Sequence, residues 1–151
     1  MKTLRAEEIL PLLMRLMVGG IFVYSGWEKL TVPIQNFMAV IQNYQFLKSP
    51  FVEWVAFILP WFELVFGTFL LLGFMMRISA GVLAVFLLSF IALLGRSLLL
   101  KLPISECGCF GSGLSLVPWQ AMILDGGLFL LALMLIFKDL RFFSLDDRLH
   151  R

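Results

Sequence analysis

The sequence predicts an all-α integral membrane protein, a single domain of residues 1–151 built as a four-helix bundle. The first observation is composition: 61% of the residues are hydrophobic and 15% are charged, whereas soluble domains are about 45–50% apolar and about 25% charged. The second is the mean hydropathy of +0.98. The third is a set of four apolar stretches, each near the roughly 20 residues that a membrane-spanning helix needs.

The first predicted span must be distinguished from a signal peptide. The four spans cover about residues 9–30, 51–74, 78–98 and 118–137, and a short tail of residues 138–151 follows them. Lys2 and Arg5 precede the first stretch as cations precede a signal sequence, but Arg15 interrupts it and no small-residue cleavage site follows. We therefore expect an uncleaved anchor.

The connections between the spans differ in length. Three residues, Met75, Met76 and Arg77, separate the second span from the third, which predicts a tight helical hairpin. The first connection, Thr31 to Pro50, carries apolar residues at helical spacing, which predicts an amphipathic segment on the membrane surface or over the end of the bundle. These residues are Phe37, Val40, Ile41, Tyr44 and Phe46.

The distribution of cations predicts the orientation of the bundle. More Lys and Arg residues lie on the side of both termini than on the side of the two long connections. By the positive-inside rule, both termini are cytoplasmic and both long connections are periplasmic, in a bacterial inner membrane. The net charge of +2 is too small to indicate nucleic acid as a partner. The apolar composition instead predicts that the protein is surrounded by the lipid bilayer.

Cys107 and Cys109, the only two cysteines of the chain, lie in the third connection and are the predicted catalytic pair. Gly108 gives the backbone the freedom to bring the two sulfurs together, and Phe110 and Gly111 continue the turn. So small a disulfide ring is strained and closes almost no loop, which favours an exchangeable bond over a structural one. An inert pair and a copper(I) site are the alternatives; two thiolates are too few for zinc, and no metal site is predicted.

Charged residues inside the spans are the second functional signal. Such groups are costly in lipid and normally face the bundle interior as pairs. Arg15 and Lys29 share one face of the first span, Glu63 lies on a similar face of the second, and we predict an Arg15–Glu63 ion pair. The pair either fixes the packing or forms part of a ligand site. The two faces are Arg15, Gly19, Phe22, Gly26 and Lys29, and Pro60, Glu63, Gly67 and Leu70.

Asp125 lies about two helical turns below the connection that carries the cysteines. It is a candidate proton acceptor for thiol chemistry, or else a structural hydrogen-bonding group. Trp27 and Trp119, with Lys29 and Asp125, are candidates for holding a quinone ring. The alternative for the tryptophans is an interfacial aromatic belt.

Three segments carry a family resemblance. Residues 15–30, the stretch 60–73 with Arg77, and the motif Cys107-Gly-Cys-Phe-Gly111 resemble the MauE branch of the DoxX-like membrane proteins. The resemblance implies a four-helix inner-membrane protein linked to redox processes and to maturation of disulfide-rich periplasmic enzymes beside a thioredoxin-like partner. It also implies Cys107 and Cys109 as the redox pair and a link to the quinone pool through the DoxX relatives.

The sequence thus predicts a thiol–disulfide oxidoreductase that exchanges electrons with a periplasmic thioredoxin-like or disulfide-containing protein, with a quinone as the candidate cofactor. Membrane disulfide-generating enzymes of similar architecture use two cysteine pairs, and this chain has one. The alternatives are a non-catalytic anchor or maturation factor and a small-solute transporter that uses Arg15 and Glu63. A homo-oligomer is compatible with the sequence.

Overall fold

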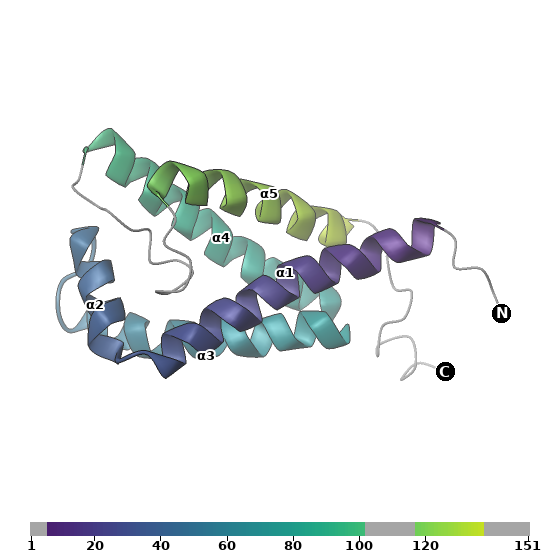
Figure 1. Cartoon of the computed structure of the whole chain (residues 1–151), viewed down its shortest axis with the longest axis horizontal. Helices are drawn as coiled ribbons and strands as arrows, with labels where there is room; N and C mark the ends of the chain where they lie inside the picture. The colour runs from purple at the N-terminus through teal and green to yellow at the C-terminus, as the bar shows by residue number, and fades with distance from the viewer. Residues whose placement is uncertain (1–5, 102–116, 138–151) are drawn as a thin grey trace.

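The computed structural model describes residues 6–101 and 117–137, and five α-helices cover most of this part of the chain (Figure 1). Four of the helices are long and apolar enough to cross a membrane, which confirms the predicted all-α fold with four spans. The helices are α1 (Ala6–Thr31), α2 (Ile34–Asn43), α3 (Phe51–Leu72), α4 (Met76–Leu99) and α5 (Pro118–Phe137).

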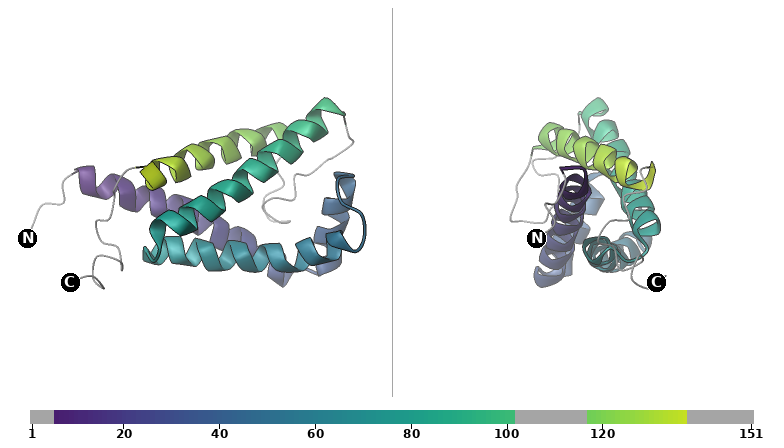
Figure 2. Two further views of the ribbon diagram at one scale, coloured as in Figure 1. Left: turned by 180° about the vertical axis from the view of Figure 1, so that it is seen from behind. Right: turned by 90° about the vertical axis from the view of Figure 1, so that its right-hand side faces the viewer.

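The long helices form two antiparallel pairs, α1 with α3 and α4 with α5, and α2 covers one end of the bundle (Figures 1 and 2). We call this the α2 end; the last turn of α4 and the first turn of α5 also lie toward it. The opposite end, called the hairpin end, holds the first turn of α1, the α3–α4 turn and the last turn of α5.

Glycines allow α1 and α3 to approach closely. A Cβ added at Gly26 would lie 2.8 Å from the Pro60 carbonyl oxygen, and one at Gly19 would lie 2.9 Å from the Gly67 carbonyl oxygen. Small residues of this kind let two membrane helices bring their backbones together. The predicted charged and glycine-bearing faces of the first two spans are accordingly buried against each other.

The α3–α4 turn is as short as predicted. Gly73 ends α3 in the left-handed conformation (φ 71°), and the Phe74 N–H donates to the Phe69 carbonyl at 2.9 Å, as in a Schellman motif. Met75 is also left-handed (φ 46°), and α4 begins at the next residue. Two left-handed residues, with only Phe74 between them, reverse the chain with almost no loop.

The predicted amphipathic segment is a helix, α2, and none of its residues is fully buried. Its apolar residues Phe37, Val40 and Ile41 face a cavity toward α3 and α4. The segment therefore covers the end of the bundle rather than extending away from it (Figure 2). This position places α2 next to the buried charges described below.

Candidate functional site

A buried ion pair joins α1 to α3 near the α2 end. The Lys29 ammonium donates to both oxygens of the Glu63 carboxylate, at 2.8 Å to Oε1 and 2.7 Å to Oε2. The Lys29 residue is 5% exposed and Glu63 is 1% exposed. A charge buried this deeply is tolerated only when it is paired and hydrogen-bonded, and both conditions are met here.

Ser25 completes this pair. Its hydroxyl accepts a hydrogen bond from Lys29 Nζ at 3.0 Å and donates one to Glu63 Oε2 at 3.2 Å. Ser25 precedes Lys29 by four residues, so the two side chains lie on the same face of α1. The serine thereby fixes the position of both charged groups.

Asp125 brings a second carboxyl group to the same place. It lies on α5, is 1% exposed, and its Oδ2 has no hydrogen-bond partner among the residues that the structure describes. Asp125 lines a cavity of about 10 Å³ together with Ser25 and Glu63, and apolar side chains form the remaining wall. We call Ser25, Lys29, Glu63 and Asp125 the polar cluster.

An apolar cavity of about 280 Å³ adjoins the polar cluster. The Lys29 ammonium lies over the rings of Phe37, at 5.2 Å from the centroid, and Phe90, at 5.5 Å. Both rings also line the apolar cavity, and Phe90 lines the small polar one as well. Phenylalanine rings thus separate the buried charges from an apolar space near the size of a small-ligand site.

Tyr44, just after α2, lines the apolar cavity and is close enough to Asp125 for the two groups to interact electrostatically. Burial is the main cause that raises the pKa of Tyr44 to about 12, and the charge that Asp125 carries at alkaline pH adds to the effect. The exposed Arg96 donates to the Tyr44 carbonyl oxygen at 3.1 Å and so ties this turn to α4. The tyrosine is therefore neutral across the physiological range.

The predicted Arg15–Glu63 ion pair is wrong, because Glu63 pairs with Lys29. Arg15 is nonetheless 2% exposed, and its guanidinium donates to the carbonyl oxygens of Leu70 at 3.2 Å and Leu71 at 2.9 Å. Carbonyl oxygens in the last turn of a helix lack intrahelical N–H donors. Arg15 therefore supplies hydrogen-bond donors to carbonyl oxygens at the C-terminal end of α3. The two residues that the transporter alternative uses, Arg15 and Glu63, therefore have different hydrogen-bond partners.

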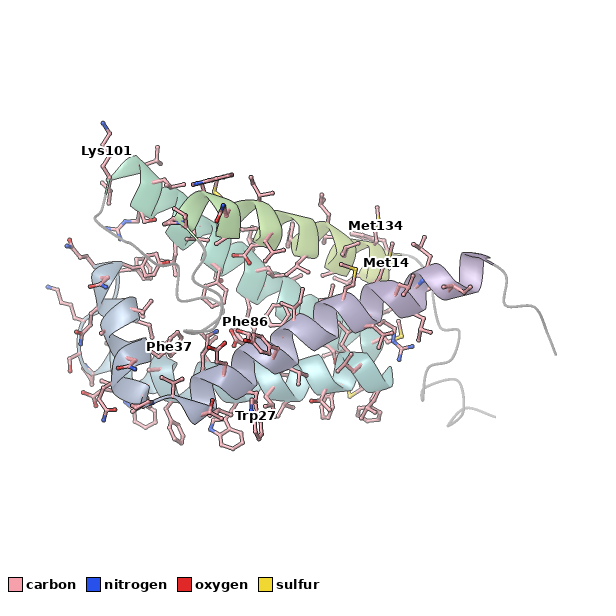
Figure 3. All side chains as sticks on the ribbon, viewed as in Figure 1. Met14, Trp27, Phe37, Phe86, Lys101 and Met134 are labelled. Carbon is pink, nitrogen blue, oxygen red and sulfur yellow. The ribbon has the colours of Figure 1, made fainter. Side chains whose placement is uncertain are left out.

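The remaining predicted site residues have different outcomes. Trp27 and Trp119 are exposed on the outside of the helices (61% and 53%), and Trp27 points away from the bundle (Figure 3). Neither lines the polar cluster's cavity or the apolar one. The cysteine loop lies outside the described residues, so its predicted roles stay predictions; it comprises Cys107, Gly108, Cys109, Phe110 and Gly111.

The sequence reasoning missed three residues of this region. Ser25 was detectable, because it lies one turn before Lys29 on the predicted buried face. Phe37 was predicted only as an apolar residue of the amphipathic segment, and Phe90 carried no signal, since phenylalanine is common throughout this apolar chain. Within residues 6–101 and 117–137, no group of three or more His, Cys, Asp or Glu side chains could hold a metal ion.

Comparison with known proteins gives one match. Residues 7–138 match the family model described as methylamine utilisation protein MauE, which covers most of the chain. Neither a curated protein nor a solved structure matched. The four apolar helices fit this assignment, and the chain belongs to the MauE family of membrane proteins.

Proposed function

We propose that this protein is a membrane thiol–disulfide redox protein in which Cys107 and Cys109 alternate between a dithiol and a disulfide. The observation that carries the proposal is the sequence Cys-Gly-Cys in the connection between α4 and α5, in a chain with no other cysteine. A strained ring of this kind has a raised reduction potential and exchanges readily.

The exchange proceeds by thiolate attack. One thiolate of the reduced pair attacks a disulfide sulfur of the partner protein, and a partner thiolate leaves. The second cysteine then attacks the mixed disulfide, so the pair becomes a disulfide while the partner gains two electrons and two protons as a dithiol. The reverse sequence reduces the pair, and the direction depends on the two reduction potentials.

A quinone is the proposed electron acceptor or donor within the membrane. Oxidation of the dithiol to a disulfide would then be balanced by reduction of the quinone to the hydroquinone. Support comes from the apolar cavity of about 280 Å³, which is bordered by phenylalanine rings and lies against the buried Lys29. An apolar space with a few polar groups at one side is typical of ligand sites.

The proposed partner is a periplasmic thioredoxin-like or disulfide-rich protein. This partner requires that the cysteine connection lies on the periplasmic side of a bacterial inner membrane. The cation distribution supports this orientation, and disulfides persist in that compartment. The description of the family supports a role in methylamine utilisation. We propose that this role is the maturation of a redox enzyme, as the resemblance of the sequence implies.

The test is a cysteine trap in native membranes. Cys109→Ser should accumulate a mixed disulfide on Cys107, or Cys107→Ser one on Cys109, visible as a protein adduct that disappears when the gel is reducing. The matched control is the double Cys107→Ser/Cys109→Ser variant, which forms no adduct. Full activity of the double variant would reject thiol exchange and favour the non-catalytic anchor.

A second measurement examines the pair itself. Alkylation of the membranes across a series of thiol–disulfide buffers should show two thiols at reducing potentials and none at oxidising ones. A pair that stays permanently oxidised or permanently reduced would contradict the proposed cycle.

A further inference from the structure

The polar cluster holds more negative groups than positive ones. Lys29 and Glu63 balance each other, and Asp125 lines the same cavity as Glu63 while its Oδ2 lacks a hydrogen-bond partner among the described residues. An ionised Asp125 would leave one uncompensated negative charge among four apolar helices. Burying such an unpaired charge costs several kcal/mol or more, whereas a neutral carboxylic acid avoids this cost.

Among residues 6–101 and 117–137, the other groups around Asp125 do not supply the missing positive charge. On α1 the cation is Lys29, which already binds Glu63 through both carboxylate oxygens. After α2 the neighbour is Tyr44, which is neutral until strongly alkaline pH. From α4 the cavity receives the apolar side chains Leu87 and Phe90, and Arg96 is exposed and bonded to a backbone carbonyl.

The hydrogen-bond geometry indicates which carboxyl group is neutral. Glu63 accepts two bonds from Lys29 and one from Ser25, all of which stabilise its ionised form. Asp125 has an oxygen, Oδ2, for which the described part of the chain provides no such donor. A proton shared between the two carboxyl groups would therefore reside on Asp125.

The cavity between these groups has the volume of a water site. It measures about 10 Å³, near the minimum of about 10–15 Å³ for one water, which also needs two to four polar partners. Ser25, Glu63 and Asp125 provide three. A water there can accept a hydrogen bond from protonated Asp125 and donate one to the Glu63 carboxylate.

From this geometry we propose a buried proton-binding site at Asp125, in which a neutral carboxylic acid is joined through one water to the Lys29–Glu63 pair. The site holds its proton at neutral pH, where a solvated aspartate is ionised. It releases the proton when the negative charge of Glu63 is removed, because Asp125 then becomes the counter-ion of Lys29. This proposal does not depend on the cysteines.

The test is infrared spectroscopy of the full-length protein in lipid nanodiscs. At neutral pH the wild type should show the C=O stretch of a protonated carboxylic acid, and side-chain ¹³C-labelled aspartate should shift that band. Asp125→Asn should remove the band. Glu53→Gln, which changes an exposed carboxyl group on the same helix as Glu63, is the matched control and should retain it.

A Glu63→Gln variant tests the coupling. It should lose the aspartic acid band, because Asp125 ionises beside Lys29. The double Glu63→Gln/Asp125→Asn variant should lose more thermal stability than the sum of the two single variants, because Lys29 then has no carboxylate in the cluster.

Two results would overturn the proposal. One is a wild-type spectrum without a protonated carboxyl band at neutral pH. The other is a band that aspartate labelling does not shift. Both are measured on the wild type, so they decide the question even if a variant fails to fold.

Discussion

The two ends of the bundle each bury a cation on the same face of α1, and they use it differently. At the hairpin end, Arg15 donates to the backbone carbonyls of Leu70 and Leu71. Toward the α2 end, Lys29 binds the carboxylate of Glu63 and lies beside two cavities. The two cations are separated by about 21 Å along the helix axis, at 1.5 Å per residue.

We interpret this difference as a structural role for Arg15 and a proposed chemical role for the region around Lys29. Arg15 fills the donor deficit of a helix end, and its planar guanidinium reaches several acceptors at once. Lys29 lies in a cluster of groups that can gain or lose protons, next to space for small molecules. Chemistry is therefore expected near the α2 end, where the ion pair also contributes to stability, and a purely structural role is expected for Arg15 at the hairpin end.

Removal of Lys29 should have the largest effect. Lys29→Met leaves the buried Glu63 carboxylate without its cation, and breaking a buried pair in this way costs about 3–5 kcal/mol. Thermal unfolding of the purified protein, followed by circular dichroism, measures the loss.

The double Lys29→Met/Glu63→Leu variant is the control for this prediction. It removes both charges, so much of the lost stability should return, because a well-packed apolar pair can replace a buried ion pair. If Lys29→Met alone melts like the wild type, the ion pair contributes nothing to folding.

Removal of Arg15 should have the next largest effect. Arg15→Met should cost about 1.5–3 kcal/mol, because the Leu71 carbonyl loses its charged donor while the Leu70 carbonyl keeps the Gly73 N–H. Arg15→Lys keeps the charge but not the planar fork, so it should fall between Arg15→Met and the wild type. Equal stability of Arg15→Lys and the wild type would show that charge alone matters.

Glycine substitutions on α1 test how closely α1 packs against α3. Gly26→Ala places a Cβ 2.8 Å from the Pro60 carbonyl oxygen and must push α1 and α3 apart. Such overpacking should lower the free energy of unfolding by about 1–3 kcal/mol. Gly20→Ala on the same helix meets nothing within 4 Å, so it should be neutral or stabilising. Equal melting temperatures for the two variants would contradict the close approach.

The smallest expected effect is the dependence of stability on pH that the titration of Tyr44 causes. Its pKa of about 12 exceeds the ordinary value of about 10, so the unfolded chain releases the phenol proton first. Stability should therefore be unaffected by this group below about pH 10 and should fall as the pH rises toward about 12.

Phenolate absorbance in a Tyr24→Phe background isolates this titration, because the chain has two tyrosines. Asp125→Asn should lower the midpoint, since it removes a negative charge that opposes phenolate formation. An unchanged midpoint in Asp125→Asn would place the aspartate too far from Tyr44 to contribute.

Hydropathy was sufficient to predict the four spans, because a membrane helix must satisfy its backbone internally and expose apolar side chains to lipid. Helical spacing likewise predicted α2 and the buried faces of α1 and α3. These are properties of single segments, so one sequence contains them.

The pairing of Glu63 depends on how far α1 slides along α3, and no single segment contains that information. Arg15 and Lys29 share a face, so either could have been the partner. The contacts of Gly26 with Pro60 and of Gly19 with Gly67 set the register, and they bring Lys29 rather than Arg15 to Glu63. The two cavities also depend on side chains from several helices and had no sequence signal.

All four tryptophans are exposed, at 49–65% of their surfaces, and lie on three different helices. Their fluorescence therefore reports the surroundings of the protein rather than its core. Bromine-labelled acyl chains should quench this emission in proportion to depth, which gives a direct measure of how the bundle is placed in a bilayer. Loss of packing inside the bundle could leave the emission almost unchanged.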